Sequence, residues 1–107
     1  MNFKETSIFT KQITELLSDD EYRKLQSLLN THPNSGPIIP GTGGLRKLRW
    51  KVQGRGKSGG IRVIYYWFDP KDEILMLFMF LKNQQANLTA YQKKMLERAV
   101  KEEYHGK

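Results

Sequence analysis

Seven basic residues and no acidic residue lie between Gly41 and Arg62, in the stretch GTGGLRKLRWKVQGRGKSGGIR. Lysine can donate or accept a proton when neighbouring cations depress its pKa, whereas arginine keeps its charge and grips phosphate oxygens with a planar fork. Together they can bind a phosphodiester, or stabilise the negative charge that develops while one is cleaved. The candidate residues for such a site are Lys47, Arg49, Arg62 and, farther along the chain, Lys82.

The excess positive charge of the chain is confined to this stretch. The 107 residues have a formal net charge of +7, and outside 41–62 basic and acidic residues occur in equal numbers. A basic patch on an otherwise neutral chain indicates a polyanionic partner. The ordinary alternative is a solvated face that aids solubility, but solubility does not require that the charge be segregated.

Other residue types that commonly carry chemistry are absent or poorly placed. The chain has no cysteine, which excludes disulfides and thiolate sites. His32 and His105 are expected at a helix end and in the tail, and no cluster of histidines and carboxylates predicts a metal site. The stretch GRGKSGG lacks the spacing of a phosphate-binding loop, and it joins two predicted strands. We therefore expect no metal and no other cofactor.

Length and hydropathy favour one small domain over residues 1–107. The longest apolar run, ILMLFMFL, is too short to cross a bilayer as a helix, and the N-terminus does not read as a secretory signal. We expect a soluble cytoplasmic protein with no membrane partner.

The cations must be positioned by strands. In LRKLRWKV, residues 45–52, alternation puts basic side chains on one face and mostly apolar ones on the other. Residues 61–68 are rich in β-branched and aromatic side chains, and residues 73–82 are apolar on both faces, which predicts a covered central strand. A glycine-rich hairpin over 53–60 would join the first two strands. If the second and third strands also pair as a hairpin, the end of the third strand, with Lys82, can converge with Arg62.

Helices are expected on both sides of these strands in the sequence. Ser18 with Glu21, and Thr89 with Gln92, have the spacing of capping boxes before apolar helical stripes. The segment ETSIF, residues 5–9, could be a short edge strand, followed by a helical turn or two. The order predicts an α+β fold: a small antiparallel sheet of three to five strands, with N-terminal helices and a C-terminal helix packed on it.

The residues alone do not separate a binding surface from a nuclease. The same patch would serve a noncatalytic RNA- or DNA-binding module, and it could also dock an acidic protein. Tyr65, Tyr66 and Trp67 could stack on bases, although alternation requires at least part of this set to lie in the core.

Three blocks of sequence carry a resemblance: GTGGLRKLRW, GKSGGIRVIYYW and LKNQQANLTAYQ. Together they resemble the RelE superfamily of bacterial toxins, and most closely its HigB-type branch. The resemblance implies a RelE-like fold and a toxin that binds the ribosomal A site and cleaves mRNA without a metal. It also implies inhibition by an antitoxin, of helix-turn-helix type and encoded by the adjacent gene, through which alone the toxin would reach operator DNA.

The resemblance also assigns roles to residues. Lys47 and Arg49 match the alternating cations of the first central strand, Arg62 matches the arginine at the scissile phosphate, and Lys82 matches a basic residue after the last long strand. Lys47 is our first choice for the general base. The expected contacts to RNA or the ribosome are Arg46, Lys51, Arg55, Lys57 and Tyr91. For Tyr91, the helical spacing to Met95 favours a core role over stacking on RNA.

Overall fold

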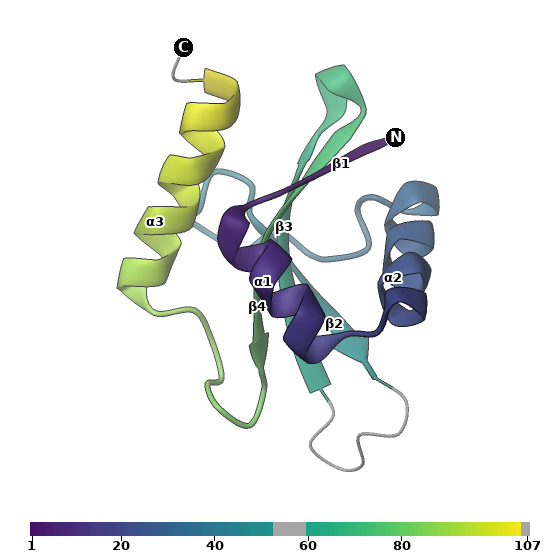
Figure 1. Ribbon diagram of the computed structural model, residues 1–107. Helices are drawn as coiled ribbons and strands as arrows, with labels where there is room; N and C mark the ends of the chain where they lie inside the picture. The colour runs from purple at the N-terminus through teal and green to yellow at the C-terminus, as the bar shows by residue number, and fades with distance from the viewer. Residues whose placement is uncertain (53–59, 106–107) are drawn as a thin grey trace.

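The computed structural model describes residues 1–52 and 60–105, without the side chain of His105. The elements follow in the order β1 (Asn2–Glu5), α1 (Ser7–Leu16), α2 (Asp19–Thr31), β2 (Arg46–Lys51), β3 (Gly60–Phe68), β4 (Glu73–Leu81) and α3 (Ala90–Val100), and a π-helical turn, Lys101–His105, continues α3. The strands form one four-stranded sheet in the order β1-β4-β3-β2 (Figure 1). The predicted α+β class is confirmed.

The sheet is mixed, because β1 joins it in parallel. β2, β3 and β4 form the expected antiparallel meander, whereas β1 pairs with β4 in parallel, with Asn2 opposite Glu73 and Glu5 opposite Met76. The predicted edge strand over 5–9 is wrong. The strand lies earlier, and Thr6 is the N-cap of α1, where its hydroxyl accepts a hydrogen bond from the Phe9 amide at 3.2 Å.

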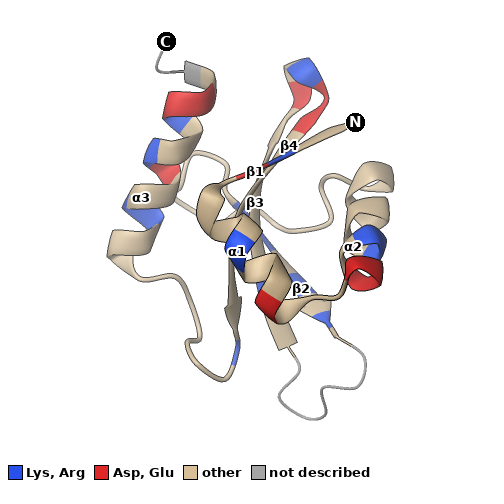
Figure 2. Ribbon diagram, in the orientation of Figure 1, with Lys and Arg blue, Asp and Glu red and all other residues tan. Residues whose placement is uncertain are grey.

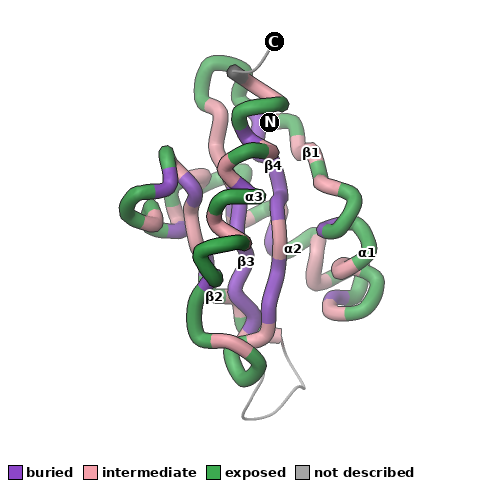
Figure 3. The backbone as a smooth tube through the Cα atoms, turned by 90° about the vertical axis from the view of Figure 1, so that its left-hand side faces the viewer, coloured by how far each residue is buried: buried purple, intermediate pink, exposed green. Residues whose placement is uncertain are grey.

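Helices cover both faces of the sheet. α1 and α2 cover one face, where Phe9, Leu25 and Leu29 are fully buried against side chains of β3 and β4. α3 covers the other face, where Leu96 and Val100 pack in a cluster with Ile64 and Leu77. β3 and β4 are therefore central and largely buried (Figure 3), as their apolar sequences predict.

A β-bulge in β4 changes which side chains face α3. Ile64 of β3 pairs with Phe78, but the next residue, Tyr65, pairs with Met76, so Leu77 is an extra residue in β4. Leu77 and Phe78 both belong to the cluster under α3. The strand therefore changes phase at this point, and every later residue lies on the face opposite to the one that simple alternation from Glu73 would give it.

Local signals in the sequence explain the helix starts and the turn into β2. The capping box of Thr89 and Gln92 is present, and the Ser18 hydroxyl accepts from the Glu21 amide at 3.1 Å. In the turn before β2, Gly44 has a φ of 112°, and a Cβ there would lie 3.0 Å from the Tyr66 ring. Glycine is required at this position because it tolerates both the conformation and the close approach.

Candidate functional site

The predicted cations gather on the α3 side of the sheet, at the end formed by the last residues of β2 and β4. Arg49 of β2 lies directly opposite Arg62 of β3, which in turn lies opposite Phe80 of β4. One step toward the sheet end, Lys51 lies opposite Gly60, whose carbonyl accepts a hydrogen bond from the Lys82 amide at 3.0 Å. Figure 2 shows the basic positions on β2 and just after β4.

We call these residues the cationic face: Lys47, Arg49, Lys51, Arg62 and Lys82. Lys47, Arg49 and Lys51 share it because side chains two residues apart point to the same side of a strand. Lys82 shares it because of the bulge, since Phe80 and Lys82 follow the change of phase. The structure thus brings the four predicted catalytic residues together, with Lys51 beside them.

Glycine at position 60 opens the centre of the cationic face. A Cβ built on Gly60 would lie 3.4 Å from Nη1 of Arg62 and 3.7 Å from Cβ of Lys82. Only 8% of Arg62 is exposed, so its guanidinium lies in a recess beside the space that Gly60 leaves. Arg62 is therefore held by its surroundings, whereas Arg49, Lys51 and Lys82 are exposed and can adjust to a ligand.

Lys47 is hydrogen-bonded to the loop between β4 and α3. Its ammonium donates a hydrogen bond to Oδ1 of Asn87 at 3.3 Å. The loop is tied to the start of α3 by Gln85, whose side chain donates to the Asn87 carbonyl at 3.0 Å and to Oε1 of Gln92 at 2.9 Å. Sequence reasoning missed Asn87, although a polar run before a capping box, KNQQAN, was a visible signal.

The positive charges of the cationic face are not neutralised by carboxylates within the described part of the chain. The ion pairs found there join Met1 to Asp72, Lys4 to Glu73 and Glu103, and Lys24 to Asp20. Residues 41–62 contain no acid at all. In residues 1–52 and 60–105 no group of three histidines and carboxylates is arranged to hold a metal ion. The arrangement suits an anion, and a phosphodiester has the matching charge.

Of three other residues predicted to contact RNA or the ribosome, Arg46 lies away from the cationic face, and Arg55 and Lys57 are not among the described residues. The Arg46 guanidinium donates to the carbonyl oxygens of Gly36, at 2.8 Å, and Asn34, at 3.4 Å, and stands 6.0 Å from the Trp67 ring. It therefore fastens the loop before β2. Arg55 and Lys57 belong to the segment 53–59, which the structure does not describe.

The aromatic residues divide between core and surface. Tyr65 is fully buried, and its hydroxyl donates to the Pro33 carbonyl at 2.7 Å, so it cannot stack on a base. Burial raises the pKa of Tyr65, which keeps the hydroxyl protonated. The core role expected for Tyr91 is wrong, because 72% of this residue is exposed on α3. His32 follows α2, which covers the opposite face of the sheet.

Comparisons with known proteins agree with the fold. A solved structure of the E. coli toxin RelE, a mutant with two arginine-to-alanine substitutions in the free state, is similar with a TM-score of 0.54 and 14% sequence identity. The match covers 78% of this chain and 85% of that one, and at this identity it supports the fold alone. Residues 40–105, more than half of the chain, match the family described as the RelE toxin of the RelE/RelB toxin–antitoxin system. This matched region holds the whole cationic face, and the chain belongs to the RelE toxin family.

Proposed function

We propose that this toxin is a ribosome-dependent endoribonuclease that cleaves mRNA at the ribosomal A site and so inhibits translation. The observation that carries the proposal is the cationic face, in which Arg49 and a nearly buried Arg62 lie opposite each other with no acid between them. Two like charges in this position repel each other. A phosphate between them relieves that repulsion, so the pair is suited to a phosphodiester.

The proposed mechanism uses the nucleophile that RNA itself contains, the 2′-hydroxyl. Lys47 is the proposed general base, which as a neutral amine would take the proton of the 2′-hydroxyl, because it lies beside the arginine pair and its nitrogen is hydrogen-bonded to Asn87. Arg49 and Arg62 would grip the scissile phosphate and stabilise the charge of the pentavalent state. As the 2′ oxygen bonds to phosphorus, the bond to the 5′ oxygen would break, and Lys82, across Gly60 from Lys51, would donate a proton to that leaving oxygen. No step requires a metal, because the cations supply the positive charge.

We also propose the surroundings in which the enzyme works. The three sequence blocks favour the HigB-type branch, with a helix-turn-helix antitoxin encoded by the adjacent gene and operator DNA bound only through the antitoxin complex. Lys51 and Tyr91, both exposed, are the proposed contacts to RNA or the ribosome. The toxin would act in the cytoplasm as one domain over residues 1–107. No helix of the described residues is long and apolar enough to span a bilayer.

The test is to map the 5′ ends of mRNA after the toxin is added to a purified translation system. We expect cuts at A-site codons for the wild type, and rates lower by about 10²-fold or more for Lys47→Ala and Arg62→Ala, since each removes a group that acts in the transition state. Lys24→Ala, on the exposed side of α2, is the matched control and should cleave like the wild type.

Two results would contradict the proposal. One is unchanged cleavage by variants of Lys47 and Arg62 whose circular dichroism spectra match that of the wild type. The other is binding to ribosomes or RNA without any cut, with an affinity that falls steeply as salt increases. The second result would identify a noncatalytic nucleic-acid-binding module that uses the same cationic face.

A further inference from the structure

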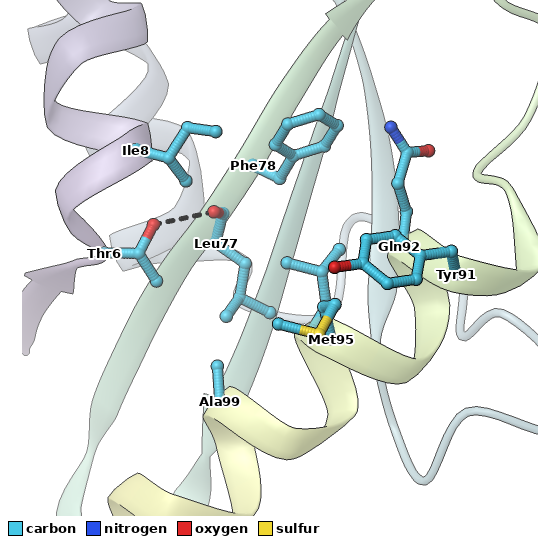
Figure 4. Close-up of a pocket in the computed structure, with 9 residues that line it drawn as sticks. Thr6, Ile8, Leu77, Phe78, Tyr91, Gln92, Met95 and Ala99 are labelled. Atoms are coloured by element: carbon cyan, nitrogen blue, oxygen red, sulfur yellow. Dashed lines mark hydrogen bonds between the residues drawn. The ribbon is translucent and has the colours of Figure 1, made fainter.

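A groove of about 390 Å³ lies between α3 and the junction of β1 with α1. Leu77 and Phe78 of β4 form its floor, Ile8 lies on one wall, and Tyr91 and Met95 lie on the other (Figure 4). The lining is almost wholly apolar. The groove is on the side of the sheet toward β1, whereas the cationic face is toward β2.

The groove collects most of the large apolar side chains that the described residues expose. Four such residues are at least partly in water, and three of them line the groove: Tyr91 at 72%, Ile8 at 48% and Met95 at 43% exposure. The fourth, Ile38 at 53%, bridges to β2 at the opposite edge of the sheet. Clustered exposure of this kind indicates a surface that is covered by a partner.

The backbone around the groove excludes an added β-strand as the occupant. β1 ends at Glu5, so on its β1 side β4 has no neighbouring strand beyond Met76. Side chains take over instead: the Thr6 hydroxyl donates to the Leu77 carbonyl at 2.7 Å, and the Gln12 amide bonds both the carbonyl and the N–H of Met79 at 2.8 Å. Because these backbone groups are already paired, an occupant must bind through side chains, as a helix does in an apolar groove.

Basic residues on α3 indicate which charge the polar side of a helix bound in the groove would have. Lys94 and Arg98 of α3 and Lys101 just after it are exposed at a spacing of four and three residues, and with Glu97 they line a shallow hollow. Arg98 follows Met95 by three residues, so the basic row borders the apolar wall. Glu5, Glu102 and Glu103 line another hollow, which shares Thr6 and Ala99 with the groove. Two of these carboxylates already have partners: Glu103 pairs with Lys4 at 2.8 Å, and Glu5 accepts hydrogen bonds from Thr10 and Tyr22. The complementary helix is apolar on one side and acidic on the flank that meets Lys94 and Arg98.

We propose that the groove is the docking site for an amphipathic, acidic helix of the antitoxin. Its apolar side chains would cover Ile8, Phe78 and Met95, and its carboxylates would pair with Lys94 and Arg98. The proposal depends on membership of a toxin–antitoxin family and does not depend on the proposed cleavage of RNA. Antitoxin bound here would leave Arg49 and Arg62 uncovered, so inhibition would come from blocking access to the ribosome.

The test measures binding of the purified antitoxin, the product of the reading frame beside the toxin gene, by titration calorimetry. The double variant Ile8→Glu/Met95→Glu places two carboxylates in the groove and should weaken binding by at least about tenfold, as should Lys94→Glu/Arg98→Glu. Ile38→Glu is the matched control, because it adds a charge at an equally exposed apolar residue on the opposite edge, and it should bind like the wild type. Melting temperatures verify that each variant is folded.

A second arm identifies the occupant. Overlapping synthetic peptides of the antitoxin are titrated with the toxin, and the peptide that competes should gain helical circular dichroism on binding. The proposal is overturned if folded groove variants bind like the wild type, or if Arg49 variants lose binding while groove variants keep it. It is also overturned if the toxin alone sediments as a dimer that Ile8→Glu/Met95→Glu dissociates, because a second copy would then fill the groove.

Discussion

At the scale of single residues, the most informative pair is Arg49 and Arg62. They are cross-strand neighbours on the same face of an antiparallel pair, a position where like charges are destabilising. Nothing in the folding of the sheet requires this, because the neighbours Ile64 and Phe80 show that the same face accepts apolar side chains. The repulsion is therefore best explained by a ligand, and stability and function should respond to its removal in opposite directions.

This reasoning predicts the effect of Arg49→Thr. Threonine is favoured in strands and removes the charge opposite Arg62, so the free energy of unfolding should stay level or rise by about 0.5 kcal/mol. Cleavage of mRNA by the same variant should fall at least about tenfold, since one of two phosphate contacts is lost. Urea unfolding and 5′-end mapping measure the two effects. A clear loss of stability would show that Arg49 is a structural residue.

Part of this site could be predicted from single residues in the sequence. Alternation along β2 correctly placed Lys47, Arg49 and Lys51 on one face, because the period of a strand is a local property. The side of the sheet taken by Lys82 depends on the bulge at Leu77, which only the pairing with β3 reveals. The helical spacing of Tyr91 correctly indicated that it shares a side of α3 with Met95. It could not show that this side faces an open groove at the start of the helix, where Tyr91 stays exposed.

At the scale of elements, the edge of β4 that β1 leaves without a strand partner is the feature that the fold must protect. An unpaired strand edge is a template for aggregation, and proteins cover or block such edges. Here Thr6, the N-cap of α1, and Gln12 within α1 do so, because their side chains hydrogen-bond backbone groups of Leu77 and Met79. α1 therefore contributes directed hydrogen bonds to the sheet in addition to the apolar contacts of Phe9.

The change that tests this role is Gln12→Ala. It leaves the N–H and carbonyl of Met79 without their side-chain partner, and we expect the free energy of unfolding to fall by about 2 kcal/mol. Lys11→Ala, an exposed neighbour on the same helix, should change it by less than about 0.5 kcal/mol. Urea unfolding gives both values, and light scattering at raised temperature shows whether the uncovered edge promotes aggregation. Equal stabilities of the two variants would refute the role of Gln12.

The elements that sequence reasoning placed correctly are those with local signals. Ser18 and Thr89 begin helices because each hydroxyl bonds an amide three residues later, and this spacing is visible in the sequence. β1 has no such signal. Its position is set by parallel pairing with a strand about seventy residues away, so the expected edge strand over 5–9 was placed too late in the sequence.

At the scale of the whole molecule, the two ends of the chain meet at one buried carboxylate, Glu73. Asn2 of β1 donates to its Oε1 at 3.0 Å, and the hydroxyl of Tyr104, beyond α3, donates to its Oε2 at 2.7 Å. The ammonium of Lys4 is 3.7 Å away and also pairs with Glu103. The Tyr104 ring stacks on Phe68 at 4.2 Å, which fixes the hydroxyl over β4. Glu73 thus joins β1, the sheet and the C-terminal turn.

This junction makes stability depend on pH through Glu73. The hydrogen bond from Tyr104, followed by that from Asn2 and the charge of Lys4, lowers the pKa of Glu73 below its ordinary value of 4.5. A lowered pKa in the folded state means that the carboxylate stabilises the fold above pH 4.5, and that this contribution is lost as pH falls through the lowered value. Acid should therefore loosen the contact of β1 and the C-terminal turn with β4.

The last prediction follows for Glu73→Gln. At pH 7 the free energy of unfolding of the variant should be about 1–2 kcal/mol lower than that of the wild type, because the neutral amide loses the charge-assisted bonds to Tyr104 and Lys4. The difference should shrink as the pH falls below 4.5 and through the lowered pKa of Glu73, because the wild-type carboxyl then becomes neutral too. Asp20→Asn removes one partner of an exposed ion pair with Lys24, and it should change stability by less than about 0.5 kcal/mol at either pH. Urea unfolding of the three proteins from pH 7 into the acid range measures these differences. A loss of stability in Glu73→Gln that stays constant with pH would mean that Glu73 contributes through packing and hydrogen bonding and not through its charge.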